Sequence, residues 1–86
     1  MQVAIPSPLR SYTQSRDRVN AAGATVAELL ASLDGAFPGI RFRIVDEQDR
    51  IRIHIRLFVN RVLVRDLSQP IAEGDEIQIL CALSGG

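Results

Sequence analysis

The stretch that decides the fold is Gly74–Gly86, which reads GDEIQILCALSGG. It contains a polar turn, a short apolar strand and a tail of small residues that ends on two glycines. Glycine has no Cβ, so a Gly-Gly end can enter a channel that excludes larger residues. If residues 82–86 are extended at about 3.3–3.6 Å each, they carry the carboxylate of Gly86 roughly 17 Å beyond the strand. This reach suits delivery into the active site of another protein, although an ordinary chain end is the alternative interpretation.

The composition is that of one folded domain. A chain of 86 residues is long enough for a single thin core. The apolar fraction of 47% and the charged fraction of 23% are ordinary, and no apolar run is long enough to cross a bilayer. The first residues lack the features of an export signal. The single cysteine, Cys81, cannot form an internal disulfide and fits a reducing compartment. We therefore expect a cytoplasmic protein with no membrane role.

The charges balance, with ten basic and ten acidic residues. A net charge of zero gives no long-range field to attract nucleic acid, so we expect no nucleic-acid partner. All ten basic residues are arginines, and lysine is absent. Without lysine the chain has no side-chain acceptor for an isopeptide bond. It could be attached to another protein, but it could not build chains on its own side chains.

A helix is predicted after residue 25. Thr25 and Glu28 have the spacing of a capping box, in which each side chain satisfies a backbone N–H at the helix start. Gly35, Pro38 and Gly39 are expected to end the helix. Apolar residues recur at helical spacing and should form one stripe that faces a core: Val26, Leu29, Leu30, Leu33 and Phe37.

Period-2 patterns predict five strands, at residues 2–5, 16–22, 51–59, 62–64 and 77–83. The strongest is 51–59, in which one set of alternate residues should face the core and the other set the opposite face of the sheet. The core set is Ile53, Ile55, Leu57 and Val59, and the other is Arg52, His54, Arg56 and Phe58. Residues 7–15 and 46–50 are expected to be loops, and Asn60-Arg61 a tight turn. The segment 40–45 fits both a strand and a short helix.

The order of these elements predicts an α+β fold of the β-grasp type, a mixed sheet of about five strands with one main helix on one face. The first and last strands should lie parallel at its centre. We assign residues 1–81 to this domain and residues 82–86 to a C-terminal tail.

One face of the predicted sheet is left uncovered. Phe58 and Leu80 should lie on it beside Arg52, His54 and Arg56, as an apolar spot with a basic rim. Exposed patches of this kind often mark partner surfaces, although isolated apolar residues on a sheet face are also common. We therefore predict a partner-binding surface, to which we assign Phe58, Leu80, Leu83 and Arg56.

Two segments carry a family resemblance. Ile71–Leu80 resembles the Gly-Asp-containing stretch of the ubiquitin-like sulfur-carrier family, and Gly85-Gly86 matches its C-terminal end. This family includes the small subunit of molybdopterin synthase, the carrier of the thiamine pathway and the carrier for cysteine biosynthesis. Ile5–Arg10 and Phe58–Asn60 look most similar to the cysteine-biosynthesis branch, whereas Cys81 stands where many members have proline. The resemblance covers the whole chain.

The resemblance implies a carrier rather than an enzyme. An E1-like adenylyltransferase would use ATP and Mg²⁺ to convert the carboxylate of Gly86 to an acyl-adenylate. A sulfur donor or sulfurtransferase would then supply the sulfur of a thiocarboxylate. Ser84 and Gly85 would form the tail that enters the partner. The acceptor would be a biosynthetic enzyme, either a pyridoxal-phosphate-dependent cysteine synthase or an enzyme that inserts sulfur into a secondary metabolite, and the chain itself would bind no cofactor.

No catalytic machinery is evident in the sequence itself. His54 has no adjacent nucleophile or ligand and is interpreted as a structural or surface residue. Cys81 falls on the apolar face of its strand and is interpreted as a packing residue. No metal-ligand cluster is found. Two alternatives stay open: the small subunit of molybdopterin synthase, and a protein modifier joined through Gly86 to a target lysine.

Overall fold

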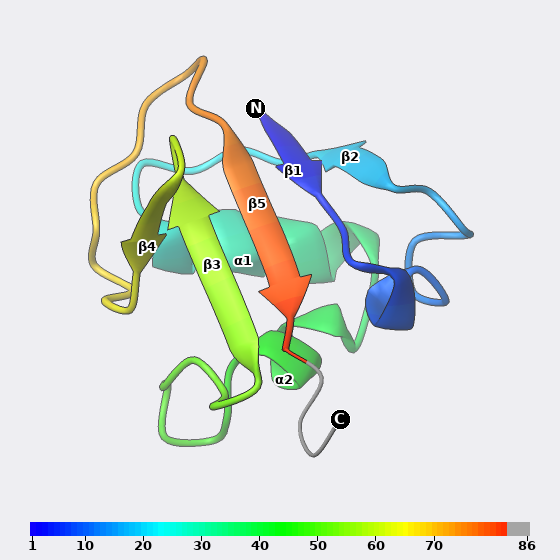
Figure 1. Cartoon of the computed structure of the whole chain (residues 1–86). Helices are drawn as coiled ribbons and strands as arrows, with labels where there is room; N and C mark the ends of the chain where they lie inside the picture. The colour runs from blue at the N-terminus through cyan, green and yellow to red at the C-terminus, as the bar shows by residue number, and fades with distance from the viewer. Residues whose placement is uncertain (83–86) are drawn as a thin grey trace.

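The computed structural model describes residues 1–82, which form a mixed sheet with the main helix across one face (Figure 1). The five strands within this range are β1 (Gln2–Ala4), β2 (Arg18–Asn20), β3 (Ile55–Val59), β4 (Val62–Val64) and β5 (Ile77–Cys81). Their order is β2-β1-β5-β3-β4, and β1 runs parallel to β5 at the centre. The helices are the 3₁₀ turn η1 (Ser7–Leu9), α1 (Val26–Ala36) and α2 (Ile40–Ile44). The β-grasp prediction is confirmed.

The core lies between the sheet and α1. Four of the five predicted helix positions are fully buried, and Phe37 is only half-buried because it caps the C-terminal end of α1. The facing side of the sheet contributes buried residues from all five strands: Val3, Val19, Ile55, Leu57, Val59, Val64, Ile77 and Ile79. Full burial of each large aliphatic side chain contributes about 1.5–3 kcal/mol, so this layer is the main source of stability.

Only one of the two hydrogen bonds of the predicted capping box forms at the start of α1. The Thr25 hydroxyl oxygen accepts a hydrogen bond from the Glu28 amide at 3.2 Å. The Glu28 carboxylate instead accepts from the amide of Ala24, one residue before the cap, at 3.1 Å. It therefore fixes the entering chain rather than the first turn of the helix.

The loop before β5 satisfies the remaining amides at this helix end. Val26 N donates to the Gln69 carbonyl at 3.1 Å, and Ala27 N donates to the Leu67 carbonyl at 2.9 Å. Amides at the start of a helix have no partner within the helix, so these bonds replace solvent or a ligand. They attach the loop to α1.

The expected strand over 51–59 is too long, since β3 begins only at Ile55. The Ile55 amide donates to the Arg52 carbonyl at 2.9 Å, which closes a turn before the strand. The prediction that Ile53 is a core residue is wrong, because its side chain is 91% exposed. The placement of Arg52 and His54 on the open sheet face is wrong for the same reason. The alternating pattern simply continues through the turn.

Within the ambiguous segment 40–45, residues 40–44 form helix α2, and Val45 is extended and forms an isolated β-bridge with Ile51. Gly39, the residue before α2, adopts a left-handed conformation with φ of 98°. The carboxylate of Asp34 accepts from the amides of Gly39 and Arg41, both at 3.1 Å. Ile40 and Ile44 are consequently both buried against the core.

The remaining boundaries differ modestly from the prediction. β2 is shorter than 16–22, and the expected loop 7–15 contains η1. β5 ends at Cys81, whereas the predicted end, Leu83, lies outside the described residues. The tight turn at Asn60-Arg61 is confirmed, since both residues have positive φ and Val59 pairs directly with Val62.

Two glycine substitutions should change the free energy of unfolding in opposite directions. A Cβ on Gly23 would lie 2.5 Å from the Leu29 backbone nitrogen, so Gly23→Ala forces the backbone apart and should cost roughly 1–3 kcal/mol. A Cβ on Gly35 meets nothing within 4 Å, and Gly35→Ala inside α1 should gain about 0.5–1 kcal/mol. Urea unfolding of both variants measures the difference. Equal stabilities would show that Gly23 is not a packing constraint.

Candidate functional site

The open face of the sheet, on the side away from α1, brings the predicted partner residues together. Arg56 on β3 lies opposite Leu80 on β5, and Phe58 lies opposite both Gln78 on β5 and Leu63 on β4. Leu80 is 42% exposed, Leu63 is 40% exposed and Phe58 is half-buried. The patch of Arg56, Phe58, Leu63 and Leu80 is called the docking face below. Leu63 was missed in the sequence because its membership depends on the register of β4.

One further backbone hydrogen bond holds the chain just after β5. The Ala82 amide donates to the His54 carbonyl at 2.7 Å, one residue beyond the last strand position. The antiparallel pairing with the β3 side therefore extends to the last described residue. Leu83, Ser84, Gly85 and Gly86 lie outside the described residues, so their predicted roles and the division at residue 81 stay predictions.

Cys81 packs inward beside this exit. It is half-buried against the core and lies opposite Ile55. Burial raises the pKa of the Cys81 thiol, which keeps it protonated and poorly nucleophilic at neutral pH. The packing interpretation of Cys81 agrees with this placement.

A small hollow of 440 Å³ borders the exit, and His54 lies on its rim with Cys81 and Ala82. Arg43 Nε donates to the Tyr12 hydroxyl oxygen across it at 2.6 Å. The exposed side chain of His54 agrees with the surface interpretation of this residue. Tyr12 and Arg43 were missed in the sequence, because they come from segments far apart along the chain.

The Gly-Asp turn at the other end of β5 is a structural link. Gly74 has a φ of 94°, and the Asp75 carboxylate accepts from the Ala72 amide at 2.8 Å and from Asn60 Nδ2 at 3.0 Å. The Asn60 side-chain oxygen in turn accepts from the Glu76 amide at 2.9 Å. The Ala72 amide, and then Asn60, hold the pKa of Asp75 below its usual value. The motif thus ties the β3–β4 turn to the start of β5.

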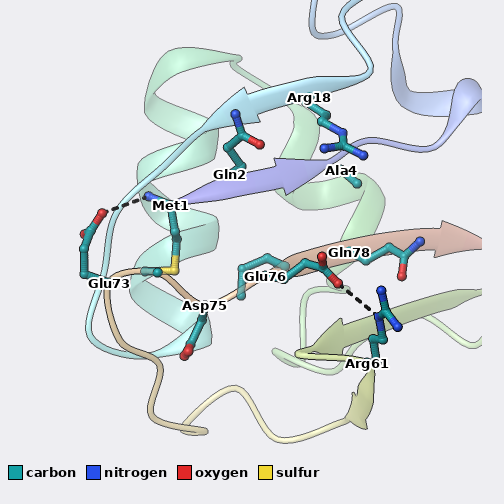
Figure 2. Close-up of a pocket in the computed structure, with 11 residues that line it drawn as sticks. Met1, Gln2, Ala4, Arg18, Arg61, Glu73, Asp75, Glu76 and Gln78 are labelled. Carbon is teal, nitrogen blue, oxygen red and sulfur yellow. Dashed lines mark ion pairs between the residues drawn. The ribbon is translucent and has the colours of Figure 1, made fainter.

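A larger pocket of 490 Å³ lies at the end of the sheet where β1 and β5 begin (Figure 2). Its walls carry charges of both signs, with Glu73 3.8 Å from the Met1 amino group and Arg61 3.7 Å from Glu76. Exposed ion pairs of this kind contribute little stability. The pocket lies at the end of β5 opposite to Ala82, so we do not assign it to the site.

The described residues hold neither a metal-ligand cluster nor a membrane-spanning helix. Within residues 1–82, no group of three or more His, Cys, Asp or Glu side chains could hold a metal ion. None of the helices in that range has the length and apolar character needed to cross a membrane.

The fold and the exposed strand end define a ubiquitin-like β-grasp protein. Residues 3–86 match the ThiS family, so the chain belongs to that family. The sulfur carrier protein CysO of Mycobacterium tuberculosis H37Rv is 34% identical over 89 residues, covering 98% of this chain and 96% of the relative.

Solved structures agree with this assignment. The crystal structure of the Amycolatopsis orientalis BexX/CysO complex contains a chain that matches with a TM-score of 0.91 and 34% identity, covering 99% of this chain and 98% of that one. The crystal structure of SAMP1 from Haloferax volcanii matches with a TM-score of 0.79 and 31% identity, covering 100% and 98%. The predicted family resemblance is confirmed.

The Asp75 link should make stability depend on pH. Because the folded pKa of Asp75 is depressed, its contribution is present above the unfolded value of about 3.9 and is lost as pH falls through the folded pKa. Below about pH 4, the free energy of unfolding of Asp75→Asn should therefore fall less steeply with decreasing pH than that of the wild type. Urea unfolding between neutral and acidic pH tests this. Asp17→Asn is the control, since the Asp17 carboxylate accepts no side-chain hydrogen bond among the described residues; equal slopes in the two variants would refute the link.

Proposed function

We propose that this protein is a sulfur carrier whose C-terminal carboxylate, on Gly86, is adenylated and then converted to a thiocarboxylate. The observation that carries the proposal is the 34% identity to the sulfur carrier CysO along nearly the whole chain. The Gly-Gly end after β5 supports it. The thiocarboxylate would donate its sulfur in the biosynthesis of cysteine or of another sulfur-containing metabolite.

The chemistry follows from the carboxylate. An α-carboxyl group with a pKa of about 3.3–3.7 is ionised at neutral pH and is a poor electrophile. In the activating enzyme, ATP and the carboxylate would form an acyl-adenylate and release pyrophosphate, with Mg²⁺ bound by that enzyme. Sulfide would then attack the acyl carbon, AMP would leave, and the thiocarboxylate would form directly. The terminal sulfur of a partner's persulfide would also displace AMP but would give an acyl disulfide, and a second thiol of that partner would have to cleave its S–S bond to release the thiocarboxylate. The carrier supplies the acyl group, and its partners supply the catalysis.

The role of the fold in this cycle is to present the tail. The docking face and the exit at Ala82 lie at neighbouring positions of β5, so one partner can contact the face while it receives the tail. An E1-like adenylyltransferase, a sulfur donor or sulfurtransferase, and a pyridoxal-phosphate-dependent acceptor would use this surface in turn. The Amycolatopsis BexX/CysO complex supports association of such a carrier with another protein.

A second function, protein modification through Gly86, is supported by one observation. A structural relative, SAMP1 of Haloferax volcanii, is 31% identical, and a further structure of it is titled a small archaeal modifier protein. Because lysine is absent, no side chain of this protein could accept a second copy.

Intact mass spectrometry should detect the loaded carrier directly. After incubation with ATP, Mg²⁺, sulfide and a cognate activating enzyme, the mass should rise by the difference between one sulfur and one oxygen. Deletion of Gly86 should abolish the gain, because the reactive carboxylate is displaced by one residue. Unchanged mass of the intact chain would refute the carrier, and isopeptide-linked peptides from cell lysate would favour the modifier.

The docking face should be needed for loading. Leu80→Asp replaces an exposed apolar residue of the face by a charge and should lower kcat/KM for adenylation roughly 10–100-fold, as loss of an interface anchor does. Val62→Asp is the matched control, because Val62 is 65% exposed and pairs with the core-facing Val59. Equal rates for the two variants would place the partner elsewhere.

A further inference from the structure

A second surface lies next to the docking face, around the start of β3. It is a hollow of 420 Å³, and the described residues that line it include four arginines and no carboxylate. Two exposed apolar side chains share it: Ile53, which is 91% exposed, and Leu63, which is 40% exposed. The arginines are Arg50, Arg52, Arg56 and Arg65, and the site is called the arginine hollow below.

Two of these guanidinium groups are held in place by the backbone. Arg52 Nε donates to the Phe42 carbonyl at 2.7 Å, and the guanidinium carbon lies 4.5 Å from the centre of the Phe42 ring. One terminal nitrogen of Arg56 donates to the Ile53 carbonyl at 2.7 Å and to the Ile55 carbonyl at 3.3 Å. Each group keeps further N–H donors for a ligand. The entropy cost of ordering these two side chains when a ligand binds is therefore already partly met in the free protein.

The charges in the hollow are only partly compensated by the fold. The Arg50 amide, and then the charges of Arg50 and Arg52, lower the pKa of the nearby Asp46 carboxyl group, so this carboxylate offsets part of the positive charge. Within residues 1–82, side-chain arginine ion pairs join Arg41 to Asp49 and Arg61 to Glu76, and none involves the four arginines of the hollow. Four like charges around one depression repel each other, and further carboxylates would relieve this repulsion. The hollow therefore complements a ligand that is anionic and has several charges.

The hollow lies at the end of the sheet from which the tail leaves. In Figure 1 the loop before β3 and the end of β5 lie at the same end of the molecule. The pairings of Ile55 with Cys81 and of Arg56 with Leu80 join the two regions directly. Arg56 thus borders both the docking face and the hollow, so a protein that covers the face and takes the tail also reaches the hollow.

We propose that the arginine hollow binds an acidic segment of a partner polypeptide, in which carboxylates flank an apolar side chain. The inference rests on the proposed function, since the partner is the enzyme that receives the tail. Carboxylates match the planar donors of arginine, and the apolar side chain covers Ile53 and Leu63.

Other anions fit the hollow less well. Inorganic phosphate would leave the apolar surface of Ile53 exposed. A nucleic acid needs a broad positive surface and free aromatic faces, whereas the chain is neutral overall and Arg52 covers one face of Phe42.

A titration tests the hollow without any enzyme. The ¹⁵N-labelled protein is titrated with a blocked peptide of sequence EDLED, and in parallel with EDGED, inorganic phosphate and a thymidine oligonucleotide. We expect EDLED to shift the amides of residues 50–56 and 63–65 and to bind several-fold more tightly than EDGED. Shifts of equal size at these amides with phosphate or the oligonucleotide, or none with EDLED, would overturn the proposal.

Kinetics with the cognate activating enzyme test the same site in its functional setting. The double variant Arg50→Glu/Arg65→Glu should lower kcat/KM for adenylation about tenfold or more, mainly through KM, and reduce its salt dependence. Arg16→Glu/Arg18→Glu at the opposite sheet edge makes the same charge change and should stay within about twofold of wild type. Urea unfolding of both variants controls for folding.

The two proposals fail differently. If the wild type is not adenylated at all, the proposed function fails and the peptide titration alone decides the hollow. If the wild type is adenylated and the two double variants behave alike, the carrier function stands and the acidic-segment proposal is refuted.

Discussion

The antiparallel ladder between β3 and β5 is the constraint on which the rest of the structure depends. It runs from Val59 opposite Ile77 to Ile55 opposite Cys81. Side chains in a strand alternate between faces, so this register sends Ile77 inward to α1 and Leu80 outward to the docking face. A slip of one residue would exchange the two sets and would place Leu80 in the core. One register therefore fixes both the core and the surface.

The two ends of this ladder are held by different chemistry. At the start of β5, the side chains of Asn60 and Asp75 link the β3–β4 turn to the Gly-Asp turn. At the end, the Ala82 amide bonds to the His54 carbonyl. Both contacts oppose sliding of β5 against β3. The proposed carrier role would benefit from this, because a partner that binds the docking face would meet a strand whose position is already fixed.

The predictable parts of the fold were those set by local periodicity. The stripe of α1 follows from helical spacing, and the strand order follows from the sequence of elements. The strand prediction was wrong for residues 51–54. The alternation of apolar residues continues unchanged from β3 into the turn that is closed by the hydrogen bond from Ile55 N to the Arg52 carbonyl. The choice of helix for 40–44 depended on Asp34 binding the amides of Gly39 and Arg41, a contact that periodicity does not contain.

The candidate site was predictable to the extent that it lies on strands already identified. Arg56, Phe58 and Leu80 meet because alternate residues of neighbouring strands share a face. Arg50 and Arg65 come together only through tertiary structure, since they flank β3 and β4 from opposite sides in sequence. A net charge of zero argues against a long-range electrostatic field, but the net charge is a sum over the whole chain and does not show how charges are distributed on the surface. Screening confines a charge to about 8–10 Å, so what a docking partner meets is the local cluster of arginines rather than the sum over the chain.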